Sequence, residues 1–252
     1  MVDKYIKLVY KNATFEDIKR EKTQSKSNDS SIMEYTRELD RYMIAMVVIA
    51  SCQLCGTNGI FFYAKQLFTE VIDGDVNLSQ QLMVGLSLCQ AAASFICSFF
   101  VDFFGRKYLL LKGQQTLIFI LFSIFIVDNL QDFLAPKLHH FCIVVLLYAH
   151  VIAFNFSLGP VAIMYAAELV PNLTPVIVTL RFVNFFVALS TNYIIHEFGI
   201  GQLFLVFGVL SAVAHTYLLT RIRETKGKSK PEIYQMFELD TYYDPEEKTT
   251  LT

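Results

Sequence analysis

Six long apolar blocks constrain this chain more than any other feature. They cover roughly residues 42–68, 82–103, 108–128, 141–166, 174–196 and 201–221. Each block is long enough to cross the hydrocarbon core of a bilayer, which takes about 20 mostly apolar residues in a helix. A strand or helix of a soluble core would be shorter and would alternate with a polar face. The sequence therefore predicts an all-α membrane protein with six transmembrane helices.

Lysine and arginine gather on one side of these blocks, which predicts the orientation of the chain. Nine lie in residues 1–41, six lie after residue 220, and Arg106 and Lys107 lie between the second and third blocks. Cytoplasmic loops carry such an excess, so we expect both termini to be cytoplasmic, as an even number of crossings also requires. In this topology Asn77 lies outside the cell and Asn172 lies inside.

The polar segment before the first block carries two signatures of a helix start. Thr14–Asp17 and Ser31–Glu34 each place an acid three positions after a hydroxyl residue, as in a capping box. A Gln-, Ser- and Asn-rich link near residues 24–31 lies between them. We therefore expect two short helices here. The segment has no apolar core, which predicts that no signal peptide is present.

Charge and cysteine usage exclude several classes of function. The formal net charge is −2 and no long basic run occurs, so we expect no nucleic-acid partner. Cys52 and Cys55 have C-x-x-C spacing, but no second pair or histidine completes a zinc site. We interpret the five cysteines as packing residues. Neither a G-x-S-x-G elbow nor an H-E-x-x-H helix occurs, so we expect no enzyme activity, no metal site and no cofactor.

The most informative stretch lies in the first block and reads Gln53-Leu-Cys-Gly56-Thr-Asn58-Gly59-Ile-Phe-Phe-Tyr63. In an unbroken helix Gln53 and Asn58 would point about 140° apart and could not meet one ligand. Gly56 and Gly59 allow the helix to unwind between these amides. Discontinuous helices are how transporters build polar sites within lipid. The alternative interpretation is that the two amides only bond neighbouring helices.

Four motifs, in order along the chain, resemble the sugar porter family of the major facilitator superfamily. The stretch from Gln53 is similar to the Q-Q-L-S-G-x-N-x-x-x-Y-Y motif of its seventh helix. Asp102–Lys107 resembles the D/E-x-x-G-R-R/K turn between helices eight and nine. Gly159-Pro160 and Ala167-Glu168-Leu169 resemble the G-P-x-P-W and E-L run of helix ten. Glu224–Gly227 resembles the P-E-T-K-G that follows helix twelve.

The resemblance implies a fold and a set of partners. The fold is the carboxy-terminal six-helix half of a major facilitator transporter, whose two halves rock around a central site. Residues 1–41 would be a cytoplasmic helical linker, 42–221 the transmembrane half-domain and 222–252 a cytoplasmic tail. The implied partners are a sugar or sugar-like solute, the lipid bilayer, and an amino-terminal half-transporter or a second copy of the chain. The plasma membrane is the expected location.

The resemblance also implies a substrate-binding role for five residues. Gln53 and Asn58 match positions that bind sugar hydroxyls, and Gln90 aligns with a sugar-contacting asparagine of helix eight. Asn155 falls at a polar position of helix ten, and Asn184 falls near a sugar-facing asparagine of helix eleven. Amides suit sugars because each offers donors and an acceptor to hydroxyls. The small, polar stripe around Gln90 fits a cavity border and a helix-packing seam equally well.

Charged residues near the cytoplasmic face form a second group. Asp102, Arg106 and Glu168 match positions that, in the family, clamp the cytoplasmic ends of the two halves in the outward-facing state. Such salt bridges break when that side opens, so their strength biases the two conformations. The alternative is that Arg106 and Lys107 only anchor the topology. We expect Arg181 to snorkel to the interface or to pair with Glu168.

Several residues depart from the family pattern. Cys52 replaces the first glutamine of the helix-seven pair, Ala162 and Ile163 replace the second proline and the tryptophan of helix ten, and Arg223 replaces the proline of the tail motif. The chain contains no tryptophan, and tryptophan is the residue that stacks on sugar faces. These departures affect the expected recognition of hexoses more than the expected fold.

We therefore expect transport of a hexose-like solute by alternating access, with an amino-terminal half required. The alternative is a truncated, non-transporting membrane protein that acts as a regulatory partner or is a fragment. The sequence names no particular solute. Pro160 should kink the fourth block because proline lacks a backbone donor. His150 and His215, which lie within helices, are interpreted as packing residues and not as proton relays.

Overall fold

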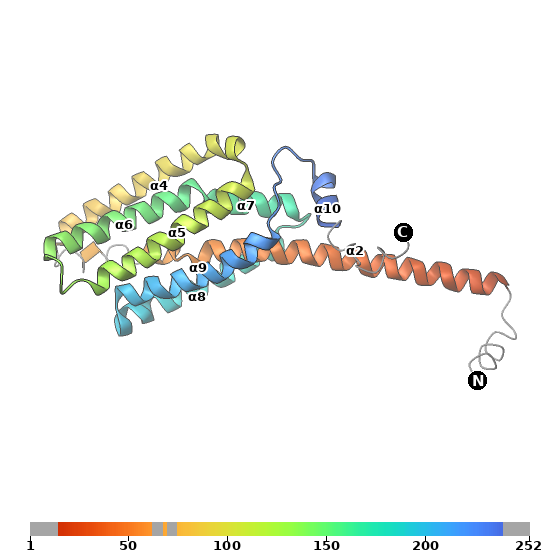
Figure 1. Cartoon of the computed structure of the whole chain (residues 1–252), viewed down its shortest axis with the longest axis horizontal. Coiled ribbons are helices and arrows are strands. Elements are labelled where there is room, and N and C mark those ends of the chain that lie inside the picture. The colour runs from red at the N-terminus through yellow and green to blue at the C-terminus, as the bar shows by residue number, and fades with distance from the viewer. Residues whose placement is uncertain (1–14, 62–67, 70–74, 239–252) are drawn as a thin grey trace, which may run out of the picture. The chain divides into compact units, whose positions relative to one another are not determined.

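The structure is a computed structural model that describes residues 15–61, 68–69 and 75–238, with side chains from residue 35 to residue 237. Its helices are α2 (Phe15–Leu54), α4 (Val76–Phe104), α5 (Arg106–Asn129), α6 (Pro136–Phe156), α7 (Leu158–Leu169), α8 (Thr174–Phe198), α9 (Ile200–Arg221) and α10 (Lys230–Glu238) (Figure 1). Thr14 and Tyr63, which belong to the predicted cap and to the Gln53 motif, lie outside the described residues.

Six helical segments are long and apolar enough to cross a membrane. They are Tyr35–Phe61, Val76–Phe104, Arg106–Asn129, Pro136–Leu169, Thr174–Phe198 and Ile200–Arg221. Each segment overlaps one of the six apolar blocks of the sequence, and their ends agree to within seven residues. The prediction of an all-α protein with six membrane-spanning helices is therefore confirmed.

The segment before the first span forms one helix, and the prediction of two short helices is wrong. α2 runs without interruption from Phe15 to Leu54. No glycine or proline lies between these ends, so no residue of the polar link near 24–31 carries the strong penalty that breaks a helix. A capping box inside such a run is overridden, because each further residue adds one hydrogen bond to a helix that has already been nucleated.

Two of the spans are broken in the middle. α2 ends at Leu54, Gly56 adopts φ 78, and helical backbone resumes at residue 57. The fourth span divides into α6 and α7 at Ser157, where φ is −134 and ψ is −87. The proline ring of Pro160 clashes with the carbonyl four residues earlier, which is that of Phe156, the last residue of α6. The expected kink is therefore present, and it lies on the amino-terminal side of Pro160.

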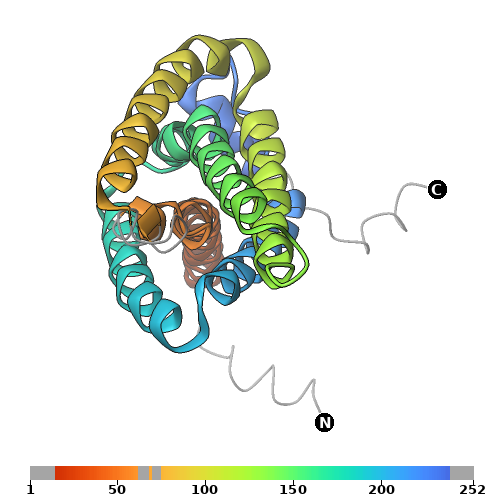
Figure 2. The same ribbon diagram turned by 90° about the vertical axis from the view of Figure 1, so that its left-hand side faces the viewer.

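The helices pack around the end of the first span. Arg41–Met236 form one compact unit, and the described residues outside these bounds belong to a second. In the first unit, α5 packs against α6 and α9, α4 packs against α6, and α8 packs against α9. Figure 2 looks along these helices and shows the orange ribbon near the end of α2 inside the ring that they form. The site-bearing stretch therefore lies at the centre of the helix bundle.

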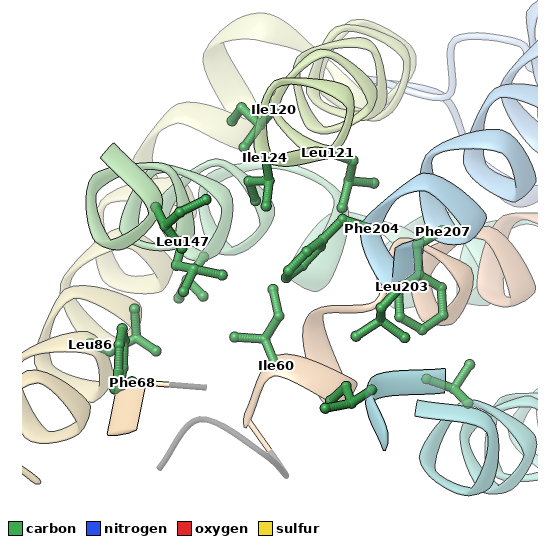
Figure 3. Close-up of a cluster of buried hydrophobic side chains, with 14 residues drawn as sticks. Ile60, Phe68, Leu86, Ile120, Leu121, Ile124, Leu147, Leu203, Phe204 and Phe207 are labelled. Carbon is green, nitrogen blue, oxygen red and sulfur yellow. The ribbon is translucent and has the colours of Figure 1, made fainter. Parts of the chain in front are cut away.

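A cluster of buried apolar side chains joins five of the helices to the segment after the α2 break. Ile60 enters the cluster from that segment and lies near Phe204 of α9 (Figure 3). The other members are Phe68 and residues of α4, α5, α6, α8 and α9, such as Leu86, Ile124 and Leu147. Large apolar side chains also cover the outer faces of α4 and α8, as expected where lipid tails or another helical unit replace water.

Candidate functional site

The break in α2 brings three predicted substrate-binding residues together. The Nδ2 atom of Asn58 donates hydrogen bonds to Oε1 of Gln53 and, at 3.3 Å, to Oδ1 of Asn184 on α8. Gln53 is buried, whereas Asn58 and Asn184 are partly exposed. The expectation that unwinding at Gly56 lets Gln53 and Asn58 meet is confirmed. These three side chains are called the amide cluster below.

Within the described residues, the amide cluster keeps unused hydrogen-bonding capacity. Among the described residues, Oδ1 of Asn58 and the amide nitrogens of Gln53 and Asn184 make no hydrogen bond. A primary amide can donate two hydrogen bonds and accept more than one. The cluster therefore offers both donors and an acceptor to a solute that carries hydroxyl groups.

Glycines let the broken helix lie close to its neighbours. A Cβ atom on Gly56 would meet Cδ2 of Phe207 at 2.3 Å, and a Cβ atom on Gly59 would meet Oγ1 of Thr191 at 2.7 Å. Both distances are far below ordinary contact. The break is thus fitted between α9 and α8, and the local sequence permits it because both positions lack a side chain.

The backbone carbonyls that the break frees are partly satisfied by polar side chains. The hydroxyl of Ser211 on α9 donates to the carbonyl of Leu54 at 3.5 Å. The thiol of Cys55 donates to the carbonyl of Cys52 at 3.0 Å. Unpaired backbone groups at membrane depth require partners in the protein or in a water-filled cavity, so these bonds help to hold the break within the bilayer.

Asn155 is placed differently from the amide cluster. It is buried at the end of α6, where its Oδ1 accepts from Ser94 of α4 at 3.3 Å and its Nδ2 donates to the carbonyl of Val151 at 2.8 Å. Gln90 is half-buried on α4 and makes no hydrogen bond to these residues in the described part of the chain. The structure therefore joins three of the five predicted residues directly and leaves Asn155 and Gln90 apart from them.

Sequence reasoning did not anticipate a polar bridge beside the amide cluster. Nε2 of His150 on α6 lies 3.0 Å from Oγ1 of Thr57, the first helical residue after the break. His150 is fully buried, and Thr57 is 1% exposed. The position of His150 within an apolar block indicated a buried polar group. Helical periodicity alone could not predict which residue it bonds.

The three predicted gating residues also meet. Nε of Arg106 lies 3.2 Å from Oε1 of Glu168, and its Nη1 lies 3.1 Å from Oδ1 of Asp102. The Arg106 and Glu168 side chains are 13% and 26% exposed, but Asp102 is 77% exposed. The Arg106–Glu168 pair is therefore less screened by solvent than the Asp102–Arg106 pair. Arg181 is exposed and forms no ion pair with Glu168 in the described residues.

Glu224 ties the tail motif to the start of α5. Its carboxylate accepts hydrogen bonds from the backbone N–H of Arg106 at 2.9 Å and of Lys107 at 3.1 Å. Gly105, at φ 87, precedes this helix and has no side chain that could supply the cap. A carboxylate at a helix N-terminus satisfies free donors and opposes the positive end of the helix dipole. Sequence reasoning gave Glu224 no such role.

The last helix has its own cap and its own contact with the first span. Ser229 donates to Glu232 from its backbone N–H at 2.7 Å and from its hydroxyl at 2.8 Å. These bonds, the backbone one foremost, hold the pKa of Glu232 below its ordinary value. Farther along α10, the guanidinium of Arg41 lies 4.1 Å from the ring centroid of Tyr234, a cation–π contact.

Comparisons with known proteins agree with this architecture. The profile of the family described as "Sugar (and other) transporter" matches residues 8–237. Sugar transporter ERD6-like 6 of Arabidopsis thaliana is 25% identical over 206 residues, which cover 77% of this chain and 42% of the relative. Solute carrier family 2, facilitated glucose transporter member 5, of Rattus norvegicus is 26% identical over 219 residues, which cover 81% of this chain and 42% of the relative.

A further relative, the facilitated trehalose transporter Tret1 of Apis mellifera ligustica, is 29% identical over 195 residues, which cover 73% of this chain and 38% of the relative. The chain thus spans less than half the length of the relatives named here. The family profile nevertheless covers most of the chain, including all the described helices from α2 to α9 and most of α10. The chain therefore belongs to the sugar (and other) transporter family.

Proposed function

We propose that this chain carries a sugar-like solute across a membrane by alternating access, acting together with a second six-helix unit. The observation that supports this function most directly is the amide cluster at the α2 break, where Asn58 bonds both Gln53 and Asn184. The cluster places donors and an acceptor inside a membrane-spanning bundle. Sugar hydroxyls match this mixture, since each can donate and accept.

The second unit would come from another segment of the polypeptide or from another chain. Glu168 supports the proposal that a second unit packs against the cytoplasmic end of this one, because its Oε2 atom is buried without a hydrogen-bond partner among the described residues. A buried carboxylate oxygen favours a cationic or hydrogen-bonding partner, because leaving it unpaired costs free energy. A basic group of the second unit would complete the Asp102–Arg106–Glu168 group as a cytoplasmic clamp when that side is closed.

The proposed topology places both termini in the cytoplasm of a plasma-membrane protein. Residues 1–41 act as a cytoplasmic linker, residues 42–221 as the half-domain and residues 222–252 as a tail. The proposal is supported by the excess of lysine and arginine at both ends of the chain. The family profile, which runs through the linker and to the last helix, also supports it.

Uptake by the full native polypeptide in proteoliposomes tests the function. Radiolabelled glucose and trehalose are the first probes, because relatives named as transporters of these sugars match the chain. Gln53→Ala removes the acceptor of the Asn58 bond and is expected to abolish uptake while the protein still folds. Gln115→Ala, at an exposed amide of α5 that bonds only Lys112 among the described residues, is the matched control and should leave uptake unchanged.

Two outcomes would contradict the proposal. Uptake that is the same in Gln53→Ala as in the unmodified protein would remove the amide cluster from the solute path. A folded, membrane-inserted native polypeptide that takes up no member of a broader panel of labelled hexoses and disaccharides would contradict sugar transport itself, and would favour a non-transporting role.

A further inference from the structure

The short helical segment after the α2 break is held by neighbours on two helices. This segment comprises residues 57–61. Asn58 bonds Asn184 of α8, and Gly59 lies so close to Thr191 of α8 that a Cβ atom would be 2.7 Å from its hydroxyl. Oγ1 of Thr57, in the same segment, lies 3.0 Å from Nε2 of His150 on α6. The position of Asn58 therefore depends on contacts at the residues before and after it.

The bond between Thr57 and His150 is the polar contact that holds the segment to α6. His150 is 0% exposed, and its Nδ1 atom has no hydrogen-bond partner among the described residues. Burying an imidazole costs free energy unless its polar atoms find partners. The ring is thus fixed through Nε2, and Thr57 accepts or donates there. A purely apolar residue of the same size would fill the space without this cost.

The bond also lies at the pivot of the broken helix. Gly56, at φ 78, directly precedes Thr57, and its N–H donates to the carbonyl of Gln53, only three residues earlier, at 3.1 Å. The segment begins its own hydrogen bonds, with the N–H of Ile60 donating to the carbonyl of Gly56 at 3.0 Å. Its first residue can therefore turn about Gly56 unless a side-chain contact restrains it.

We propose that His150 is a positioning residue for the solute site: its hydrogen bond to Thr57 fixes residues 57–61 and so places the Asn58 amide against Gln53 and Asn184. This inference rests on the proposed function, because it assigns a task to His150 within the same site. The residue does not touch the solute. It acts through Thr57, and its loss weakens solute binding by letting the amide cluster separate.

The chemical accessibility of a thiol beside the break can show whether the Thr57–His150 contact is intact, and this measurement needs no solute. Cys55 is 0% exposed, and its Sγ atom lies 3.5 Å from Oγ1 of Thr57. If the segment turns about Gly56, this thiol becomes reachable. The assay measures the rate at which N-ethylmaleimide labels Cys55 in the native polypeptide from which the chain's other cysteines have been removed. The alanine replacements are at Cys52, Cys89, Cys97 and Cys142.

Paired variants separate the hydrogen bond from simple packing. His150→Phe keeps a ring of similar size without the polar atom, and we expect labelling to become about fivefold faster, the opening expected when one hydrogen bond is lost. His150→Gln keeps a hydrogen-bonding group and should label at the unmodified rate. Thr57→Val and Thr57→Ser repeat the comparison from the other partner, so a folding defect in one histidine variant does not remove the test.

The double variant checks that the two residues act through each other. Thr57→Val with His150→Phe should label no faster than Thr57→Val alone, because Thr57→Val already removes the bond to His150 together with the contact to the Cys55 thiol. His215→Phe, in α9 and outside the amide cluster, is the control and should leave labelling unchanged. Labelling that stays at the unmodified rate in both His150→Phe and Thr57→Val, or that multiplies in the double variant, overturns the inference.

Glucose uptake then links the contact to the solute. We expect His150→Phe to raise KM about fivefold with kcat little changed, since a positioning contact alters binding before it alters turnover. Gln53→Ala is measured in parallel. If Gln53→Ala abolishes uptake but His150→Phe leaves KM unchanged, the inference fails while the proposed function stands. If Gln53→Ala leaves uptake unchanged, the amide cluster lies outside the solute path and the inference fails with it, whereas a folded native polypeptide that takes up no sugar contradicts the proposed function itself.

Discussion

At the scale of residues, the structure separates what helical geometry dictates from what it leaves open. Gln53 and Asn58 could be predicted to meet only if the helix unwinds between them, because the angle per residue is fixed. Asn184 could be named from the family resemblance, but its bond to Asn58 could not. Side-chain partners far apart in sequence depend on how the helices pack, and a single sequence does not encode that packing in any local pattern.

Glu224 illustrates the same limit and gives a testable prediction. Glu224→Ala removes the acceptor for two backbone N–H groups of α5, at Arg106 and Lys107. We expect a loss of about 1–2 kcal/mol of stability, the upper part of the range for a lost helix cap. The measurement is the apparent melting temperature of the purified protein in detergent micelles.

The matched control for this prediction is another glutamate near a helix end. Glu197, in the last turn of α8, is exposed, and its side chain makes no hydrogen bond in the described residues. Glu197→Ala should change stability by less than about 0.5 kcal/mol, as is usual for surface sites. An equal loss in both variants would show that the Glu224 carboxylate does not cap α5.

At the scale of elements, the sequence predicted that the six spans exist, but it predicted the positions of the breaks within them only approximately. The glycines at 56 and 59 indicated where α2 opens, and the structure has the break at Gly56. Pro160 indicated a bend in the fourth span, yet α6 ends at Phe156 and α7 begins at Leu158. A proline acts on the carbonyl four residues earlier, so the break precedes the residue that causes it.

The break in α2 predicts an unequal response of two glycines to substitution. Gly56 and Gly199 both adopt positive φ, at 78 and 90. An alanine at Gly199 would meet nothing within 4 Å, whereas at Gly56 its Cβ atom would lie 2.3 Å from the Phe207 ring. Gly199→Ala should cost about 1–3 kcal/mol for the backbone alone, because φ 90 with ψ 173 is a conformation that glycine adopts almost exclusively, and Gly56→Ala should cost more.

Melting temperatures of the two glycine variants in the same detergent check this prediction. The Phe207 ring is buried, at 2% exposure, so it has little room to move away from an added methyl group. A smaller loss in Gly56→Ala than in Gly199→Ala would mean that the break is not closely packed against α9.

At the scale of the whole molecule, the six spans fall into two triplets with a shared pattern. Each triplet starts with a broken span, at Gly56 in α2 and at Ser157 between α6 and α7. Each ends with a helix that follows a positive-φ glycine, α5 after Gly105 and α9 after Gly199. Nested three-helix repeats of this kind occur within each half of major facilitator transporters.

The same capping solution also recurs in both triplets. Glu224 accepts from the first turn of α5, and Asp128 accepts from the N–H of Gly201 in the first turn of α9 at 3.0 Å. In each case the preceding glycine supplies no side-chain cap. The carboxylate instead comes from outside the capped helix. The two triplets therefore share both the arrangement of their broken spans and the way in which their last helix is capped.

The topology predicts which loops an impermeant reagent reaches. Asn77 and Asn172 are both exposed, and the proposed topology, which rests on the distribution of lysine and arginine, predicts that Asn77 lies outside the cell and Asn172 inside. In a cysteine-free background, Asn77→Cys should react with an impermeant maleimide on intact cells, whereas Asn172→Cys should react only after permeabilisation. The reverse pattern would invert every loop of the proposed arrangement.

The contact between Glu224 and α5 has a consequence for biosynthesis. The carboxylate lies 118 positions after the Arg106 amide that it receives, so α5 is inserted into the bilayer long before its cap has been translated. Until the tail emerges from the ribosome, water or lipid headgroups must serve those amides. Completion of the membrane domain therefore waits for a residue beyond its last helix, and a nascent chain released just after Arg221 would reach the quality-control machinery with an uncapped helix.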